Sequence, residues 1–486
     1  MNLQQLVQNV RFKGIKNYKD VKIDNLTNSS TKDTNQALYF CLKGSKVDGH
    51  EFAEEAVKNG AVALVVERYL DLSVTQILVD NARVAMSNIS ANFYEFEKSN
   101  IKFIGVTGTN GKTTTAFVTR HILQNLGKRV GMIGTEGIYI GDIKLPAQLT
   151  TPDPIKLHKI IHDMDLNGIE YVVMEVSAHA LALHKVDSIM YDVVGITNIT
   201  QDHLDYFNTM ENYARAKAEL FTYKRAKKAI INIDDKYTRA IRKRCNIETE
   251  TLSLHKFADI MIDESDFQVN KTQAIININN KQYMLNSSLV GEYNLSNLLM
   301  AVSFCKSLGF EVGEILQAFN KTSIVVPGRL NLIQTPNNVS VVIDYAHTPD
   351  GIEKVLTTLN QIKDDGKLIV VFGCGGNRDN TKRAKMGELA TKLGDFVVVT
   401  SDNPRFENPN QIIADIEKGI SSENSISIVD RTTAINYALS MAKQGDIVAI
   451  LGKGNEPYQE IKDIKYTYSD YKVVDDYYHD EYQLIK

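Results

Sequence analysis

A glycine-rich run at residues 107–115, TGTNGKTTT, has the residue types that bind a phosphate group. It follows an apolar run at 102–106 that is typical of a buried strand, and helical spacing comes after it. Between a strand and a helix, backbone N–H groups and the helix dipole attract anions. Lys112 can place its charge on the β- and γ-phosphates, and the Thr113 hydroxyl can bind a magnesium ion. The run therefore predicts a nucleotide-binding loop.

The spelling of this loop departs from the strict G-x-x-x-x-G-K pattern, because Val106 occupies the first glycine position. A short glycine-rich turn that binds no phosphate is the alternative reading. The helical pattern beyond the loop favours phosphate binding, since Val118, Ile122 and Leu126 recur on one helix face. We expect that helix to end at Gly127 through a left-handed cap.

A second set of candidate residues, Asp402-Asn403-Pro404-Arg405, follows a strand-like run at 396–400. The carboxyl edge of an α/β sheet is where such folds bind ligands. An Asx-type turn closed by proline is the alternative. Arg405 can hold a carboxylate by two parallel hydrogen bonds, Arg378 supplies a second cation, and Glu456 can bind an ammonium group. Two arginines and one glutamate complement a zwitterionic ligand.

The elements that position these residues are predicted to be alternating strands and helices. Up to about residue 97, the pattern indicates a small α/β domain. Its strand-like runs are 37–42, 61–66 and 76–79, and its helical runs are 51–59 and 82–96. The next series indicates a parallel sheet covered on both faces, with further strands at 171–176, 192–199 and 229–233.

A break at 325–328 precedes a third series with the pattern of a doubly wound α/β domain. Its strands are expected at 341–344, 368–372, 396–399 and 447–451, with helices beginning near 351, 382, 411 and 432. The predicted fold is thus α/β in three domains. They are a small N-terminal domain at 1–98, a central phosphate-loop ATPase domain with a parallel sheet at 99–327, and a Rossmann-like C-terminal domain at 328–486.

Composition agrees with a globular chain of about three domains, since 43% of the 486 residues are hydrophobic and 23% are charged. A net charge of −4 excludes a uniformly basic surface for nucleic acid. Apolar runs such as 61–66 fall far short of the roughly 18 residues that cross a bilayer. The N-terminus lacks the features of a secretory signal, so we expect a cytoplasmic protein. Four scattered cysteines are interpreted as reduced thiols.

Several sequence blocks in this order resemble the Mur ligases, the ATP-dependent, amide-forming enzymes of peptidoglycan precursor synthesis in the cell wall. The central blocks are GTNGKTT (108–114), TTPDP (150–154), MEVSAH (174–179), TNITQDHLDY (197–206) and YARAK (213–217). The later blocks are DYAHTP (344–349), FGCGGNRD (372–379), DNPR (402–405) and GKGNE (452–456). The later blocks resemble the members that add the third amino acid of the stem peptide.

The resemblance implies an ADP-forming ligase with ATP as co-substrate. The free carboxylate of a UDP-muramoyl dipeptide would attack the γ-phosphate, and an amine would then displace phosphate from the acyl phosphate. Lys112, His203 and Lys217 are the catalytic residues that it implies. It also implies Mg²⁺, held by Thr113, Glu175, His203 and Lys217, the last as a carbamate made from carbon dioxide. A carbamate could bridge metal ions where a positive lysine would repel them, although Lys217 alone could be a solvent-facing lysine.

The resemblance also assigns binding residues along the chain. Those for ATP are Gly108, Thr109, Asn110, Gly111, Lys112, Thr113, Thr114, Asn297, Arg329 and His347. Those for the UDP-substrate are Ser30, Thr150, Thr151, Ser177 and Lys185. Those for the amino acid are Arg378, Asp402, Asn403, Pro404, Arg405, Gly452 and Glu456. Three places depart from the family pattern: Lys185 and Asn455 replace Arg and His, and the uridine contact Asp-Ser-Arg is replaced by residues 28–31, where we favour Ser30 over Ser29.

The amino acid that the resemblance implies is meso-diaminopimelate, because members with this substrate share the Asp-Asn-Pro-Arg spelling. A diamino diacid has a distal carboxylate that lysine lacks, and Arg405 can bind it. L-Lysine and LL-diaminopimelate stay open as alternatives, and the muramoyl-like blocks disfavour a folylpolyglutamate synthetase. From a different class, a binding module that uses ATP only as a switch has the same loop and sheet. We expect a monomer that binds small molecules, with no nucleic-acid or membrane partner.

Overall fold

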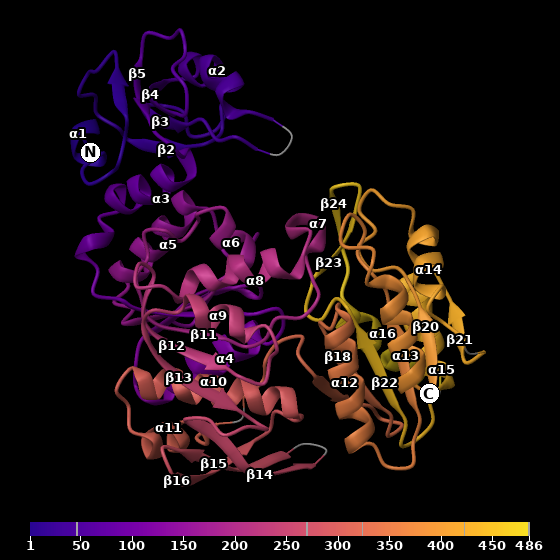
Figure 1. Ribbon diagram of the computed structural model, residues 1–486. Coiled ribbons are helices and arrows are strands. Elements are labelled where there is room, and N and C mark those ends of the chain that lie inside the picture. The colour runs from indigo at the N-terminus through magenta and orange to yellow at the C-terminus, as the bar shows by residue number, and fades with distance from the viewer. Residues whose placement is uncertain (45–46, 269–270, 323, 422, 485–486) are drawn as a thin grey trace. The chain divides into compact units, whose positions relative to one another are not determined.

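The computed structural model describes residues 1–44, 47–268, 271–322, 324–421 and 423–484 (Figure 1). The chain forms two compact units. Met1–Gly105, Gly127–Val194 and Ala216–Lys228 make the first unit, and Val106–Leu126, Gly195–Arg215 and Ala229–Lys486 make the second. Among the described helices, none is long and apolar enough to span a membrane. The four cysteines carry free thiols, as predicted.

The N-terminal part of the first unit is a five-stranded sheet with helices on both faces. Its strands lie in the order β1-β5-β4-β3-β2, and only β1 is antiparallel to its neighbour. Ala63 and Val65 of β4 pack with α1 and α3, whereas Leu64 and Val66 pack with α2. The strands are β1 Gly14–Lys16, β2 Asn25–Thr27, β3 Ala37–Phe40, β4 Ala61–Val66 and β5 Thr75–Leu78. The helices are α1 Leu3–Leu6, η1 Gly49–Phe52, α2 Ala53–Lys58, α3 Ala82–Phe93 and η2 Phe96–Lys98.

The central segment contributes one sheet of eleven strands in the order β16-β15-β14-β13-β12-β11-β6-β10-β7-β8-β9. In the first unit, β10 is parallel to β7, but β7, β8 and β9 form an antiparallel arm. In the second unit, β13 is parallel to β14, and β14, β15 and β16 form an antiparallel meander. Two antiparallel arms that the sequence did not predict thus extend the predicted parallel sheet. Only a few residues separate consecutive strands within each arm, too few for the crossover connection that a parallel pair requires.

The strands of this sheet are β6 Lys102–Thr107, β7 Val130–Gly134, β8 Gly137–Ile140, β9 Ile143–Leu145, β10 Tyr171–Glu175, β11 Tyr191–Ile196, β12 Ala226–Asn232, β13 Glu248–Ser253, β14 Ile260–Gln268, β15 Lys271–Ile278 and β16 Lys281–Ser287. The helices of the segment are α4 Lys112–Asn125, α5 Pro154–Leu166, α6 Ala178–Ala182, α7 Leu204–Phe207, α8 Met210–Ala218, η3 Glu219–Phe221, α9 Thr238–Arg244, α10 Glu292–Ser307 and α11 Val312–Phe319. Helix α4 ends at a C-cap on Leu126, and Gly127 has the predicted left-handed conformation with φ +80°.

The C-terminal part of the second unit is the doubly wound domain that the sequence predicts (Figure 1). Its sheet has the order β17-β18-β22-β19-β20-β21, and every pair except β17–β18 is parallel. Val370 of β19 packs with α12, α13 and α14 on one face, whereas Val371 packs with α15 and α16 on the other. The same alternation of neighbouring residues recurs along β18, β20 and β22.

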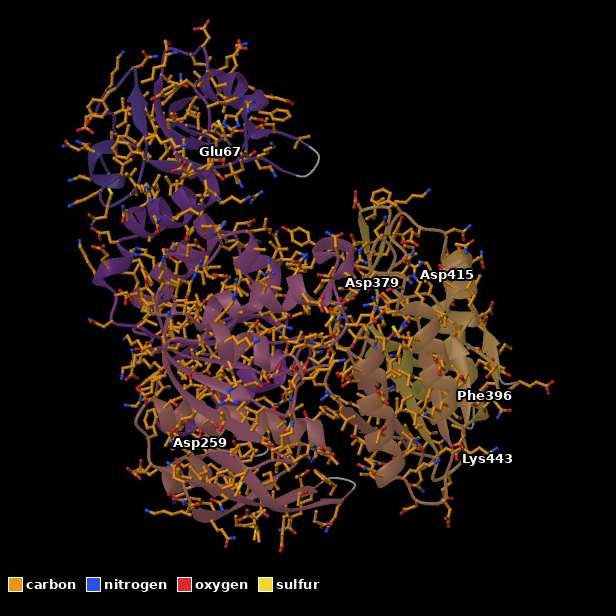
Figure 2. The ribbon with its side chains drawn as sticks, in the orientation of Figure 1. Glu67, Asp259, Asp379, Phe396, Asp415 and Lys443 are labelled. Carbon is orange, nitrogen blue, oxygen red and sulfur yellow. The ribbon has the colours of Figure 1, made fainter. Side chains whose placement is uncertain are left out.

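The strands of this domain are β17 Asn331–Gln334, β18 Ser340–Asp344, β19 Leu368–Phe372, β20 Phe396–Val399, β21 Ser425–Ser427, β22 Ile447–Leu451, β23 Tyr458–Ile461 and β24 Ile464–Thr467. The helices are α12 Pro349–Ile362, α13 Arg383–Leu393, α14 Pro409–Glu417, α15 Arg431–Met441 and α16 Asp470–Leu484. The antiparallel hairpin β23–β24 lies directly after the GKGNE block. Charged residues also fix the packing. Asp415, which Figure 2 labels on α14, accepts a hydrogen bond from Nη1 of Arg383 at 3.0 Å.

Candidate active site

Both glycines of the predicted phosphate loop are required by its geometry. Gly108 has φ +145°, and a Cβ there would lie 1.9 Å from Oγ1 of Thr197. Gly111 has φ +87°, and a Cβ there would lie 2.3 Å from Oδ1 of Asn297. An L side chain at either position would be both strained and without space. The loop thus brings its backbone close to the segment after β11 and to α10.

Hydrogen bonds fasten the loop to the residues that follow β11. The Thr109 N–H donates to the Asn198 carbonyl at 2.9 Å, and the Asn110 N–H donates to Oδ1 of Asn198 at 3.0 Å. The Thr197 hydroxyl donates to the Asn110 carbonyl at 2.6 Å. The Thr109 hydroxyl also lies 3.2 Å from the hydroxyl of Tyr213. These bonds make the loop rigid, as a phosphate cradle requires.

The loop leads into the N-terminus of α4, whose N-cap is Gly111 and has no side-chain cap. Helix N-termini of this kind attract anions. Lys112 curls back over the loop, because its Nζ donates to the carbonyls of Gly108 at 3.0 Å and Thr109 at 2.8 Å. A positive charge and a helix N-terminus therefore belong to one loop, which suits a phosphate chain.

Two further residues that were assigned to ATP lie beside this loop. Asn297 on α10 accepts a hydrogen bond from the Thr115 hydroxyl at 3.4 Å. Arg329 donates from Nη2 to the Thr113 hydroxyl at 3.2 Å, and its guanidinium lies 4.4 Å from the centre of the Tyr345 ring. Within the second unit, the structure thus brings these residues to the phosphate loop, although they are far away in sequence.

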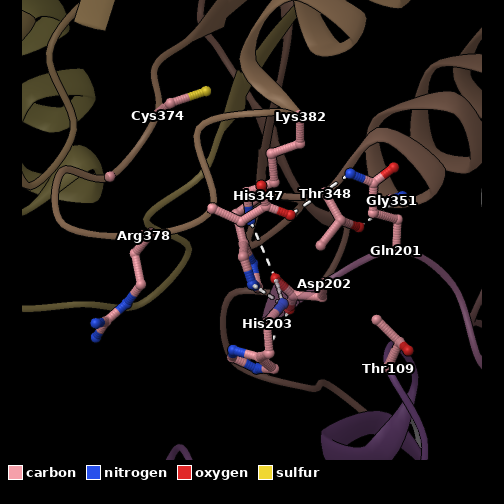
Figure 3. A network of polar contacts seen from close by, with 12 residues as sticks. Thr109, Gln201, Asp202, His203, His347, Thr348, Gly351, Cys374, Arg378 and Lys382 are labelled. Carbon is pink, nitrogen blue, oxygen red and sulfur yellow. Dashed lines mark hydrogen bonds and ion pairs between the residues drawn. The ribbon is translucent and has the colours of Figure 1, made fainter. Parts of the chain in front are cut away.

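The remaining residue of that assignment, His347, belongs to a cluster of charges around Asp202 (Figure 3). The Asp202 carboxylate lies 3.2 Å from Nζ of Lys382, 3.4 Å from Nε2 of His203 and 4.0 Å from Nε2 of His347. Burial raises the pKa of the Asp202 carboxyl, but these three neighbours outweigh burial and hold its pKa well below the usual range. Burial lowers the pKa of His347, and the charge of Lys382 lowers it further. Asp202 is thus an anion at neutral pH.

Sequence reasoning did not single out Asp202 or Lys382, although both are buried in this cluster. Asp202 lies within the TNITQDHLDY block. Its charge and its position just after a predicted strand were the only features of the sequence that could have indicated a role. Lys382 marks the start of α13 and gave no signal of its own. Asn110 of the phosphate loop makes a similar long-range contact, because its Nδ2 donates to Oδ2 of Asp350 at 2.8 Å and to the Thr348 hydroxyl at 3.3 Å.

In the first unit, three of the residues predicted to bind the UDP-substrate, Thr150, Thr151 and Ser177, lie near Glu175 at the end of β10. Glu175 is fully buried and accepts hydrogen bonds from the Thr135 N–H at 3.0 Å and hydroxyl at 3.2 Å. The Thr150 hydroxyl lies 3.0 Å from that of Thr135. The Thr151 hydroxyl donates to the Glu175 carbonyl at 2.8 Å and accepts from the Ser177 N–H at 3.2 Å. The strand end thus collects one carboxylate and several hydroxyls.

Lys185 and Lys217 are both buried rather than solvent-facing. Lys185 lies 2.9 Å from the Asp153 carboxylate and donates to the Thr151 carbonyl at 3.4 Å, which keeps its charge beside the same threonines. The Lys217 side chain on α8 is 1% exposed, so the reading of a solvent-facing lysine is wrong. A buried amine must be neutralised, paired or modified, which is the environment that carbamate formation requires.

In the N-terminal domain, the structure distinguishes Ser29 from Ser30. The Ser29 hydroxyl accepts hydrogen bonds from the N–H groups of Thr31 at 3.4 Å and Lys32 at 3.2 Å, which closes a local turn. Among the described residues, the Ser30 hydroxyl has no such partner, and only the Ser30 carbonyl is used, by Asn59 at 2.8 Å. The geometry therefore favours Ser30 for a ligand contact.

The Asp-Asn-Pro-Arg segment after β20 lies in a network of charged side chains. The Asp402 carboxylate faces Gly452, where a Cβ would lie 2.7 Å from Oδ2. Asn403 donates from Nδ2 to Glu456 at 2.9 Å. The Pro404 carbonyl lies so close to Gly376 that a Cβ on this glycine would be 2.0 Å from the carbonyl oxygen. Six of the seven residues assigned to the amino acid therefore lie together at the carboxyl edge of this sheet, namely Asp402, Asn403, Pro404, Arg405, Gly452 and Glu456.

The seventh, Arg378, is exposed and donates to the Asn377 carbonyl at 3.2 Å, and it flanks Gly375 together with Arg405. In Figure 3 its side chain extends away from the cluster around Asp202. Two residues that the sequence did not predict take part in the network. Lys453 is fully buried and donates to Asn403 at 3.0 Å and to Glu456 at 3.1 Å, and Glu460 pairs with Arg405. Lys453 thus compensates the charge of Glu456.

The predicted magnesium ligands are an oxygen and nitrogen donor set of the kind that Mg²⁺ accepts. Thr113 and His203 belong to the second unit, and Glu175 and Lys217 belong to the first. Within the part of the chain that is described, no group of three His, Cys, Asp or Glu residues is placed as a metal site. The predicted set contains a threonine hydroxyl and a lysine carbamate, so a magnesium site with these donors stays a prediction. The buried Glu175 carboxylate and buried Lys217 fit such a role.

The fold and site together define an α/β protein that carries a phosphate loop and, on a doubly wound domain, a charge-paired ligand site. Three family models match in succession: the Mur ligase family catalytic domain at 22–110, the Mur ligase middle domain at 106–305 and the Mur ligase glutamate ligase domain at 328–454. Curated relatives match over nearly the whole chain. This chain therefore belongs to the Mur ligase family.

Two such relatives are named UDP-N-acetylmuramoyl-L-alanyl-D-glutamate–2,6-diaminopimelate ligase. The protein of Clostridium acetobutylicum, which bears this name with the numeral 1, is 40% identical over 98% of this chain and 99% of its own length. The protein of Caldanaerobacter subterraneus is 41% identical over 95% of this chain and 96% of its own. A solved structure of a ligase with the same name has a TM-score of 0.68 and 30% identity and covers 95% of both chains.

A more distant structure is the MurF ligase of Thermotoga maritima in complex with ADP. It has a TM-score of 0.61 and 21% identity, and it covers 89% of this chain and 95% of its own. At that identity it shows a shared fold alone. These Mur ligase structures have a three-domain architecture, which confirms the predicted fold class. The boundaries at 98 and 327 stay predictions.

Proposed function

We propose that this protein is an ATP-dependent ligase that joins meso-diaminopimelate to UDP-N-acetylmuramoyl-L-alanyl-D-glutamate and releases ADP and phosphate. The observation that carries the proposal is about 40% identity, over nearly the whole chain, to proteins that bear the name of this activity. The geometry supports it, because the chain has a phosphate loop and a network of charged side chains that would suit a zwitterionic diacid. The reaction serves peptidoglycan synthesis, and a cytoplasmic monomer fits its soluble, small-molecule substrates.

The nucleotide part of the proposal rests on the loop at Gly108, Gly111 and Lys112. The N-terminus of α4 and the Lys112 charge suit the β- and γ-phosphates of ATP. The ADP complex of the MurF ligase from Thermotoga maritima agrees with this use of the shared fold. Thr109, Asn110, Thr113 and Thr114 would supply further contacts to the phosphates, and Asn297, Arg329 and His347 lie near the loop or its charge cluster.

In the proposed reaction, the glutamyl carboxylate attacks the γ-phosphate of ATP and forms an acyl phosphate. The amine of the incoming amino acid then attacks the acyl carbon, and phosphate leaves through a tetrahedral intermediate. Both steps gather negative charge, so Lys112 stabilises them electrostatically and the rigid loop orients the phosphates. No side-chain nucleophile is required, because the carboxylate of the substrate is itself the nucleophile of the first step.

Mg²⁺, when bound, neutralises phosphate charge and polarises the γ-phosphoryl group. We assign its ligands as Thr113, Glu175, His203 and Lys217, the last as a carbamate. Glu175 and Lys217 are buried, which suits charged groups that are compensated by a metal. A mass spectrum of native protein kept in bicarbonate would show an added carbamate mass, and a free amine at Lys217 under these conditions would overturn this assignment.

The two other substrates are assigned to the remaining sites. The UDP-muramoyl dipeptide would contact Ser30 in the N-terminal domain and Thr150, Thr151, Ser177 and Lys185 near the end of β10. The amino acid would bind at the carboxyl edge of the C-terminal sheet. There Arg405, with Arg378, would hold its distal carboxylate, and Glu456 and Asp402 would bind ammonium groups.

One assay separates this proposal from its alternatives. Purified protein is given ATP, Mg²⁺ and UDP-muramoyl dipeptide, together with meso-diaminopimelate, LL-diaminopimelate or L-lysine, and ADP release is measured. We expect turnover that requires both the dipeptide and meso-diaminopimelate. Turnover with lysine at equal kcat/KM would contradict the amino-acid assignment, and turnover that needs neither would indicate an ATP-switched binding module.

A further inference from the structure

Arg405 is held by contacts that leave part of its guanidinium available. Its backbone has the left-handed conformation, with φ +51°, and its N–H donates to the Glu460 carbonyl at 3.1 Å. Its Nε donates to Oε2 of Glu460 at 3.1 Å, and its Nη1 donates to the Gly376 carbonyl at 2.9 Å. Among the described residues, Nη2 has no hydrogen-bond partner. The edge of the guanidinium that carries Nη2 therefore remains for a ligand.

Glu460 is itself fixed, because its backbone is bonded to the same segment. Its N–H donates to Oδ1 of Asn403 at 2.9 Å, while its carbonyl accepts from Arg405. It lies on β23, where Lys465 of β24 is its antiparallel partner. Only 18% of the Glu460 side chain is exposed, the same fraction as for Arg405. A carboxylate that is anchored by its own main chain can set the orientation of the arginine beside it.

We infer that Glu460 is the positioning residue of the amino-acid site: it binds Nε of Arg405 and so directs Nη2, together with the N–H of Nη1 that does not bond Gly376, toward the distal carboxylate of a diacid. This inference rests on the proposed function, which does not itself assign a role to Glu460. An arginine offers a carboxylate two parallel hydrogen bonds only when its plane is correctly oriented. Glu460 supplies that orientation through one hydrogen bond, so an uncharged acceptor at this position should serve as well.

The kinetic test compares Glu460→Ala with Glu460→Gln, whose amide oxygen can still accept from Nε. Glu460→Ala should raise the KM for meso-diaminopimelate roughly tenfold and leave kcat, the KM for ATP and the KM for the UDP-dipeptide within about twofold. Glu460→Gln should retain the wild-type KM. Glu388→Ala is the matched control, since Glu388 is an exposed glutamate on α13 in the same domain. An unchanged KM in Glu460→Ala, or an equal loss in Glu460→Gln, overturns the inference.

A spectroscopic test is independent of turnover. In full-length protein with ¹⁵N-labelled arginine, the Nε–H resonance of Arg405 is assigned by its loss in Arg405→Lys. We expect this proton to be protected from exchange in the wild type and in Glu460→Gln, and exposed in Glu460→Ala. A proton that exchanges equally fast in all three overturns the positioning role. A wild type that has this protection but no turnover with diaminopimelate contradicts the proposed function instead, so the two failures are distinguishable.

Discussion

Gly111 and Gly127 both have a positive φ, but only Gly111 lacks space for a side chain. A Cβ on Gly111 would collide with Asn297, whereas no heavy atom lies within 4 Å of a Cβ on Gly127. Backbone strain acts at both positions, and steric exclusion acts at Gly111 alone. Substituting each glycine in turn therefore distinguishes the effect of backbone strain on stability from the effect of a distorted phosphate loop on ATP binding.

Gly111→Ala should abolish ATP binding, because the added methyl group forces the loop away from α10. Gly127→Ala, the matched control, should lower the free energy of unfolding by about 1 kcal/mol and leave ATP affinity unchanged. Isothermal titration with ATP and urea unfolding measure the two effects. Equal ATP affinity in both variants would show that the loop does not need glycine at position 111.

Buried His158 on α5 predicts a dependence of stability on pH. Its Nε2 lies 2.7 Å from the Ser188 hydroxyl, and its Nδ1 has no hydrogen-bond partner among the residues that the structure describes. Burial lowers the pKa of His158 to about 3. Because the pKa in the folded state is depressed below that of the unfolded chain, protonation favours unfolding. The stability that neutral His158 contributes is complete above about pH 6.5 and is lost as the pH falls below it, by about 1.4 kcal/mol per pH unit.

Urea unfolding at pH 7.5 and pH 5 tests this in His158→Gln. The variant should lose less stability on acidification than the wild type, because glutamine does not titrate. His162→Gln changes a half-buried histidine on the same helix and serves as the control, with a wild-type pH response expected. An unaltered pH response in His158→Gln would place the acid sensitivity elsewhere.

How far sequence could predict single residues depended on local signals. Gly111, Lys112 and Arg405 lie in short motifs whose residue types suggest their chemistry. Lys382 and Glu460 do not, because each acts through a partner that is distant in the sequence: Asp202 and Lys382 are 180 residues apart, and Arg405 and Glu460 are 55 apart. The order of the strands in the sheets determines such pairings, and that order cannot be deduced from one sequence.

A buried ion pair holds helix α16 against the C-terminal sheet. Arg431, at the start of α15, donates to the Asp470 carboxylate from Nε and Nη2 at 2.8 Å, and both side chains are fully buried. Arg431 also donates to the Leu451 carbonyl at 3.0 Å. The pair thus joins α15, α16 and β22 in one hydrogen-bonded unit.

Asp470→Asn should destabilise the C-terminal domain by about 3–5 kcal/mol, because it leaves a guanidinium buried without its counter-charge. The double variant Arg431→Met/Asp470→Leu should be much less destabilised, since it buries no charge. Urea unfolding of the full chain, followed by tyrosine fluorescence, measures both. If the single and double variants were equally unstable, packing of α16 rather than charge compensation would be the cause.

Elements were predictable where the residue pattern was strong. The runs at 61–66, 368–372, 396–399 and 447–451 became β4, β19, β20 and β22 with those bounds. The meander β14–β16 and the hairpin β23–β24 were not predicted, because many of their residues, including all of β24, are exposed and many of their side chains are polar. Pairing with a neighbouring strand, rather than hydrophobic pattern, determines such strands.

At the scale of the whole molecule, the second unit gathers distant chain segments around Asp202. This residue, between β11 and α7, meets Lys382 at the start of α13, and both side chains are less than a tenth exposed. Gln201, its neighbour, donates to the Thr381 hydroxyl at 2.9 Å. Since residues 195–215 also fasten the phosphate loop, this contact ties the nucleotide site to the C-terminal domain within one unit.

Lys382→Met should therefore lower both the free energy of unfolding and kcat, and these two effects can be measured separately. It leaves the Asp202 carboxylate buried without its main counter-charge, which should cost about 3–5 kcal/mol of stability. It should also reduce kcat at least about tenfold, because Asp202 orients the backbone of His203 by accepting its N–H at 3.0 Å. Lys385→Met, an exposed lysine on α13, is the control and should change neither quantity.

The double variant Asp202→Asn/Lys382→Met decides between the two effects. With no unpaired charge left in the interior, its free energy of unfolding should recover most of the loss, since a neutral amide is far less costly to bury than a carboxylate. Its kcat should stay low, because the charge that faces His203 and His347 is gone while ATP affinity, which depends on the phosphate loop, is retained. Recovery of kcat together with stability would mean that the cluster only supports the fold, and that His203 performs its role without the anion beside it.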